Sequence, residues 1–258
     1  SLHDATSPST WRGSSAAGAP WALAEFVVVL EGHGPGGPAG VEQDEQQVTL
    51  VFRDAQYLLD RDVQENLYAG TGGLEGGPSL KDKRKPKLGG IGRNLAPDFL
   101  GQLPTAAGAF LPAFRFHDGA VEAFDAAVHR FWIAGVPIEH DASFPPAAGK
   151  WHLDATNGVA WFNGALTGEV TMDAWGAAGV ATLADAVRYV GACCGFADPA
   201  GMDTAALAQA DIDQPATVGF WRPEARNALD LLDELCGPLL FTFGVTLAGL
   251  LTLAQFKA

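Results

Sequence analysis

The clearest secondary-structure signal in the chain is Trp151-His152-Leu153-Asp154-Ala155-Thr156-Asn157-Gly158-Val159-Ala160-Trp161-Phe162. Apolar residues dominate both of its ends, and Asn157-Gly158 between them supplies the positive φ of a tight turn. The stretch therefore predicts a β-hairpin. The whole chain agrees with this, since 32 glycines and 16 prolines with only 18% charged residues fit turn-rich β structure and exclude a disordered polyelectrolyte or a long coiled coil.

Further alternating runs predict strands on both sides of this hairpin. Residues 169–175 alternate after a second Asn-Gly signal, which predicts a strand. Residues 113–116 and 120–124 alternate around His117-Asp118-Gly119, where Asp-Gly favours a tight turn. We expect these two runs to pair as a second hairpin.

The first third of the chain has weaker signals. Residues 1–20 have turn composition without a period, which predicts a linker or frayed end. Residues 25–30 and 47–52 are β-branched runs that we expect to pair. Residues 54–62 are expected to form a short helix or turn, and residues 70–77 a loop, because glycine at this density does not hold a regular element.

The last third changes character and predicts helices. Thr182 can cap a helix whose apolar residues follow a period of 3.6, and a second helix is expected to begin near Pro223 and to stop at Gly237-Pro238. Residues 203–210 predict a short helix between them. Residues 239–243 and 249–256 are expected to form a closing hairpin.

These elements predict a β-rich α+β fold. We expect two β-barrel-like or sandwich-like regions with hairpins, followed by a helix-helix-hairpin module. The expected division has four parts: a linker over 1–20, a β region over 21–100 that includes the Gly-rich loop 70–77, a β-hairpin region over 101–176, and an α+β module over 177–258.

The charge is strongly acidic overall and basic in one place. Sixteen Lys and Arg stand against 30 Asp and Glu, a net charge of −14, which would repel nucleic acid and anionic membranes. Between residues 81 and 93 the chain has six cations and one acid. That run lacks interleaved aromatic residues, so a contact between subunits or a solvated loop is favoured over sequence-specific nucleic-acid binding.

The apolar run over residues 237–256 is broken by proline and glycine, so strands are expected there and no membrane span. We expect no signal peptide at the start of the chain. The first residue is Ser and the methionines are Met172 and Met202. We therefore expect a piece of a longer polypeptide, or one processed at its start.

No motif for catalysis, a metal or a cofactor stands out. Residues 70–77 lack the Gly-Lys-Ser/Thr step of a phosphate loop, and Gly-x-Ser-x-Gly is absent. Glu139-His140-Asp141 with His152 and Asp154 has metal-ligand residue types, but no spacing fixes a geometry, so a solvated loop is favoured. The three cysteines are too few and too badly spaced for a disulfide framework, and Cys193-Cys194 is expected in a core.

Tryptophan could form a sugar-binding groove. Trp151 and Trp161 are the candidate glycan contacts, with Trp132 and Trp175 on neighbouring predicted strands. Tryptophan on alternating strands is more often part of a core or an interface, so this alternative stands second.

Several stretches, in order, resemble tail proteins of long-tailed bacteriophages and prophages. The first is Asn66-Leu67-Tyr68-Ala69-Gly70-Thr71-Gly72-Gly73-Leu74-Glu75-Gly76-Gly77, followed by Leu80-Lys81-Asp82-Lys83-Arg84-Lys85-Pro86. The others lie at residues 92–97, 116–123, 168–173, 205–210, 218–220 and 227–233. The resemblance covers about residues 25–256.

The resemblance is to baseplate hub and tail-tip proteins. It implies a ring-forming, trimeric structural subunit at the distal end of the tail tube, without a catalytic site or cofactor, in contact with tail-tube, tail-tip and fibre proteins. The implied location is the virion tail, assembled in the bacterial cytoplasm. The expected subunit-contact loop consists of Gly70, Gly72, Gly73, Glu75, Lys81, Lys83, Arg84 and Lys85.

Two alternatives from other classes stay open at this point. One is a carbohydrate-binding β module for host-surface recognition, which would use Trp151 and Trp161. The other is a tail-associated cell-wall hydrolase, since the separation of a carboxylate pair is a spatial quantity that no sequence reveals.

Overall fold

The structure is a computed structural model that describes residues 10–11, 21–22, 41–43, 48–50, 55–106 and 108–256. Residues 56–246 and 250–258 group into one compact unit, apart from the earlier residues. Among those earlier residues, β1 (Thr10–Trp11) pairs with β2 (Trp21–Ala22), and β3 (Val41–Gln43) with β4 (Val48–Leu50). β4 lies in the predicted strand 47–52, whereas its predicted partner 25–30 lies outside the described residues.

An antiparallel sheet of five strands forms one layer of the main unit. Its order is β13 (Gly219–Arg222), β5 (Lys87–Leu95), β12 (Val170–Trp175), β8 (Arg130–Ile133) and β9 (Val136–Ile138). The predicted strand at 169–175 is thus confirmed as β12. It pairs with β5, about 80 residues earlier, as Trp175 lies opposite Ile91.

A second antiparallel sheet faces the first. Its order is β10 (Trp151–Asp154), β11 (Val159–Phe162), β7 (Phe110–Arg115) and β6 (Asp98–Pro104). The hairpin predicted at 151–162 is confirmed, with Trp151 opposite Phe162. Phe131 of the first sheet contacts Phe114 and Trp151 of the second, with ring centroids 5.7 and 5.6 Å apart. The described sheets form an open sandwich rather than a closed barrel.

The predicted hairpin of 113–116 with 120–124 is wrong. Strand β7 pairs with β6 on one edge and with β11 on the other, so it has no free edge for residues 120–124. Gly119 does have a positive φ of 120°, but the turn carries the chain away from β7. Val121 instead donates its N–H to the carbonyl of Ala155 and forms a bridge with Ala177.

The helices form a separate core within the same unit. Helix α1 (Leu183–Cys193) begins with a capping box, in which Thr182 accepts from the Asp185 N–H and Asp185 reaches back to the Thr182 N–H. Helix α2 (Thr204–Asp213) is capped by Asp203. Both helix starts agree with the prediction because the residues that set them are local.

Helix α3 (Ala228–Cys236) begins five residues after the predicted start at Pro223. Strand β13 continues to Arg222, and the backbone that follows is bonded by the buried Gln64 side chain, which donates to the carbonyls of Arg222 and Glu224. Asn227 then caps the helix by accepting from the Leu229 N–H. The predicted stop is confirmed, because α3 gives way at Gly237 to a 3₁₀ turn, η6 (Gly237–Leu239).

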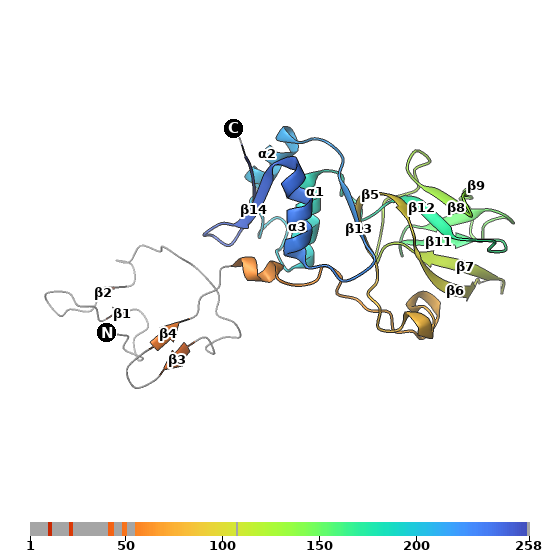
Figure 1. The fold of residues 1–258 in the computed structure, drawn as a ribbon, viewed down its shortest axis with the longest axis horizontal. Coiled ribbons are helices and arrows are strands. Elements are labelled where there is room, and N and C mark those ends of the chain that lie inside the picture. The colour runs from red at the N-terminus through yellow and green to blue at the C-terminus, as the bar shows by residue number, and fades with distance from the viewer. Residues whose placement is uncertain are drawn as a thin grey trace. The chain divides into compact units, whose positions relative to one another are not determined.

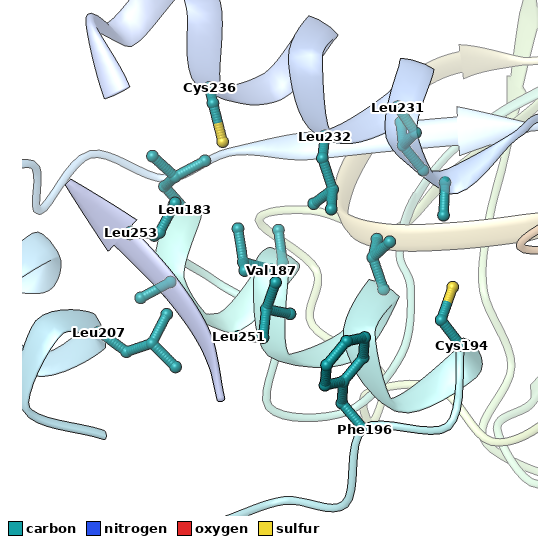
Figure 2. Packing of buried hydrophobic residues seen from close by; sticks show 14 of the residues in the cluster. Leu183, Val187, Cys194, Phe196, Leu207, Leu231, Leu232, Cys236, Leu251 and Leu253 are labelled. Carbon is teal, nitrogen blue, oxygen red and sulfur yellow. The ribbon is translucent and has the colours of Figure 1, made fainter. Parts of the chain in front are cut away.

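The predicted closing hairpin is also confirmed, as β14 (Phe241–Val245) and β15 (Leu251–Gln255). Figure 1 shows the helices gathered at one end of the unit and the sandwich at the other. Side chains from α1, α3 and β15 point into one shared core (Figure 2), where Cys194 and Cys236 are buried. Burial raises the pKa of both thiols to about 12, so they behave as small apolar residues.

Across the described residues, every helix is too short or too polar to cross a lipid bilayer.

Candidate functional site

The Gly-rich segment covers the outer face of the four-stranded sheet. Two short 3₁₀ turns lie in this segment, η4 (Gly73–Glu75) and η5 (Pro78–Leu80), whereas an earlier one, η3 (Ala55–Leu59), packs on the helical core through Leu59. Tyr68 and Leu80 are buried against that face, in a cluster that includes Leu100, Leu103, Leu111 and Trp161. The predicted loop at 70–77 therefore belongs to a longer segment, residues 66–86, that packs on this face through a small core of its own. We call this segment the Gly-rich cover.

Two of its glycines have a steric role. Gly70 has a φ of 69°, and a Cβ there would lie 2.6 Å from the Cβ of Lys81. Gly76 has a φ of 66°, and a Cβ there would meet Leu80 at the same distance. Side chains are excluded at both positions because the two arms of the segment pass close together.

Glu75 holds the turn closed from inside. Its Oε2 accepts from the Ala69 N–H at 3.1 Å, and its Oε1 lies 2.7 Å from Nζ of Lys85. The hydrogen bond from Lys85 is the largest cause of the lowered pKa of this carboxyl, so the ion pair persists at neutral pH. Lys85 is buried, which makes this pair a structural contact within the chain.

Arg84 is also committed within the chain. Its guanidinium lies 2.8 Å from Oδ2 of Asp62 and donates to the carbonyl of Gln64 at the same distance. These bonds hold the end of the Gly-rich cover against residues 62–64, which precede it. Two of the four predicted contact cations, Arg84 and Lys85, therefore bind their own chain.

Lys81 and Lys83 differ from those two. Both are exposed, and neither forms an ion pair among the residues that the structure describes. They lie at the tip and the return arm of the same cover, two residues apart, with Asp82 between them at a positive φ of 64°. Within the described part of the chain, the cover thus presents two cations without an ion pair, although Lys83 also acts electrostatically on the carboxyl of Asp98.

A buried polar cluster joins the cover to both sheets. Asp118 lies 3.2 Å from Arg115 and 3.7 Å from Lys87, and accepts from Asn66 at 2.7 Å. The neighbouring His117 is buried, and its Nδ1 accepts from the Leu88 N–H at 2.9 Å. Burial lowers the pKa of His117 to about 4, so this imidazole is neutral at pH 7.

The candidate glycan tryptophans are packed. Trp151 is 1% exposed and stacks on Phe131, and Trp161 is 8% exposed with its ring 5.2 Å from that of Phe144. Neither presents an open ring face to solvent in this conformation. Trp132, by contrast, is half-buried on the outer side of β8.

The residues around Glu139-His140-Asp141 form a structured loop. Asp141 accepts from the N–H groups of Ser143 and Ala147, and Glu139 pairs with Lys150 at 2.9 Å. The rings of His140 and His152 stack with centroids 6.1 Å apart. No group of three or more His, Cys, Asp or Glu in the described part of the chain is arranged to hold a metal ion.

Sequence reasoning missed Arg130 and the polar cluster at His117. The alternation of Arg130, Phe131, Trp132 and Ile133 could have placed Arg130 and Trp132 on one face, since odd and even residues of a strand point to opposite sides. The role of His117 had no such signal, because its partner Leu88 is 29 residues away.

Comparisons of the chain with protein-family models, with curated proteins and with solved structures yield no match. The function is therefore argued from the residues of this chain and from the resemblance in its motifs.

Proposed function

We propose that the chain is a structural subunit of a phage or prophage-derived tail, at the hub or tip of the tail tube. In this role it assembles with further copies of itself as a trimer, within the virion tail. Its other partners are tail-tube, tail-tip and fibre proteins. The role is that of a scaffold and not of an enzyme.

One observation carries this proposal: the unpaired lysines of the Gly-rich cover. Lys81 and Lys83 are exposed, whereas their neighbours Arg84 and Lys85 are bound within the chain. In a chain with 30 acidic residues, a second copy offers many carboxylates to such a pair. Opposite charges on two copies guide their encounter and fix the register of the contact.

The cover is also suited to a fixed contact. Its backbone is held by the Glu75 carboxylate and by the packing of Tyr68 and Leu80, so the two lysines project from an ordered base. A contact made from an ordered segment loses less conformational entropy on assembly than one made from a loose loop. The resemblance to tail proteins includes this same segment, residues 66–86.

Sedimentation velocity of matched variants tests the proposal. We expect Lys81→Gln with Lys83→Gln to weaken self-association of the chain and its unfolding free energy to change little, because both side chains are exposed. Raised salt should weaken association of the unaltered chain in the same way.

The control is Arg61→Gln with Lys150→Gln, which removes the same charge from cations that pair within the chain. If the control weakens association as much as the lysine variant does, net charge and not the cover is responsible. That outcome would overturn the assignment of the contact to Lys81 and Lys83.

A further inference from the structure

The outer edge of the five-stranded sheet carries a hollow of about 600 Å³. Its walls come from β8, β9, the residues before β8 and after β9, and Trp151 of β10. The residues that the argument uses are Phe124, Arg130, Trp132, Pro137, Glu139 and His140. A hollow of this volume lies within the range of small-ligand sites in proteins.

Aromatic rings form much of this hollow. Phe124 and His140 stack face to face, with ring centroids 3.5 Å apart and planes inclined by 6°. Trp132 lies opposite Pro137 across the β8–β9 pair, and on the same side of the strand as Arg130. Flat rings beside one another in an open hollow fit a ligand with a flat, weakly polar face, such as the C–H face of a pyranose.

A row of charges crosses the sheet beside the rings. Arg93 on β5 pairs with Asp173 on β12 at 2.9 Å, and Arg130 on β8 lies opposite Asp173 in the strand register. Beyond Arg130, Glu139 pairs with Lys150 at 2.9 Å. The row has three cations and two anions, and among the described residues Arg130 is the member that forms no ion pair.

Of the two charged side chains that line the hollow, Glu139 is paired with Lys150, so the Arg130 guanidinium is the charge left open to a ligand. Arg130 is exposed, so its planar donors are open to an incoming group. A guanidinium binds a carboxylate through two parallel N–H···O bonds, which a neutral hydroxyl does not match. A guanidinium that forms no ion pair among the described residues favours an anionic ligand at this place.

A buried polar atom in the wall points to hydroxyl groups. Nε2 of His140 is buried and has no hydrogen-bond partner among the described residues. Leaving such an atom unpaired costs free energy of about 1 to 3 kcal/mol. Burial lowers the pKa of His140, so the ring is neutral at pH 7 and one nitrogen can accept a hydrogen bond from a sugar hydroxyl.

We propose that this hollow binds a saccharide with a carboxylate, a hexuronic acid unit, with Arg130 holding the carboxylate and Trp132 and Phe124 contacting the ring. Trp151 also lies in the wall of the hollow, but it is only 1% exposed, so the ring contacts are assigned to Trp132 and Phe124. The hollow lies on the five-stranded sheet, whereas the Gly-rich cover lies on the four-stranded sheet, so binding does not depend on the proposed assembly.

Isothermal titration calorimetry of the full chain with tetragalacturonate tests the proposal. The matched ligand is its methyl ester, which keeps the rings and removes the charges. We expect the acid to bind at least about tenfold more tightly than the ester, since a charge-assisted pair contributes that much. Arg130→Gln should remove this preference, and Arg61→Gln, an equal charge change outside the hollow, should leave it intact.

Combining the change of ligand with the Arg130→Gln substitution makes the test specific, because their effects on the binding free energy should not add. If Arg130 holds the carboxylate, the ester should bind Arg130→Gln and the unaltered chain with equal affinity. Trp132→Ala should weaken binding of the acid and of the ester alike. Should the acid fail to bind, or bind no better than the ester, or bind Arg130→Gln as well as the unaltered chain, the proposal is overturned.

Discussion

The helical module and the β-sandwich each have an apolar core, but their structures are specified in different ways. In the helical module the ends of α1 and α2 are set by side chains at most three residues from the backbone they cap. In the sandwich, β13 pairs with β5 about 130 residues away, Trp221 lying opposite Leu88. Helices are thus specified locally and this sheet by pairing over long distances, which is why functional surfaces in the sandwich are hard to foresee.

Two buried polar side chains connect these regions. Gln64 bonds three backbone groups between β13 and α3, namely the carbonyls of Arg222 and Glu224 and the N–H of Arg226. His117 accepts from the backbone N–H of Leu88 on β5, and its ring centroid lies 6.3 Å from that of Tyr189 on α1. Together with the β13–β5 pairing, these bonds predict that the two cores unfold in one transition.

Truncation of a core side chain should have the largest effect on the unfolding free energy. Phe131→Ala in the sandwich should cost about 3 to 5 kcal/mol, and Leu232→Ala in the helical core about 2 to 5 kcal/mol, because both side chains are buried. Urea unfolding followed by tryptophan fluorescence and by circular dichroism should show one shared transition for each variant. Two separate transitions would mean that the regions are independent.

Gln64→Ala tests whether this side chain connects the helical module to the sandwich. It leaves three backbone groups without their side-chain partner, so we expect a loss of about 2 to 3 kcal/mol of unfolding free energy. Gln209→Ala, the same change at an exposed helix position, should cost under about 0.5 kcal/mol. Equal effects in urea unfolding would show that Gln64 does not connect the regions.

His117 predicts a pH dependence at the sandwich side of the junction. Because its pKa is about 4 in the folded chain and ordinarily 6.5, the unfolded chain takes up the proton first as pH falls. The stability is fully present above pH 6.5 and is lost as pH falls toward 4, with about 2 kcal/mol lost by pH 5.

His117→Asn keeps an acceptor for the Leu88 N–H and removes the titration. The unfolding free energy of this variant should fall less between pH 7.5 and pH 5 than that of the unaltered chain, by about 2 kcal/mol. Parallel pH profiles for the two proteins would refute the role of His117.

Thr182→Ala tests whether the local cap sets the start of α1, and its expected effect is the smallest. Thr182 caps α1 and donates to Asp211 on α2, so its loss should cost about 1 kcal/mol. Thr156→Ala in an exposed turn serves as the control and should change the unfolding free energy by under about 0.5 kcal/mol. A cost at Thr182 no larger than at Thr156 would mean that packing alone sets the start of α1.

The same contrast explains which elements the sequence predicts. The hairpin at 151–162, the cap at Thr182 and the closing hairpin rest on neighbouring residues, and the structure has all three. The Asp118-Gly119 signal failed because β7 has both edges occupied by distant strands. The predicted start of α3 is wrong because Gln64, more than 150 residues earlier, donates to the carbonyls of Arg222 and Glu224, on either side of Pro223.

The candidate site follows the same rule. The sequence predicts the basic cluster as a unit, but it does not separate Lys85, which pairs with Glu75, from the exposed Lys81. That separation depends on how the cover folds back on itself. The hollow at Arg130 likewise needs Phe124 and His140, which only the tertiary structure brings beside β8.

Light scattering of the purified chain over a concentration series tests the proposed self-assembly as a tail subunit. We expect a mass that rises with concentration to three times 26.9 kDa, and a shift toward 26.9 kDa for the Lys81→Gln, Lys83→Gln variant. A mass of 26.9 kDa at every concentration would contradict it.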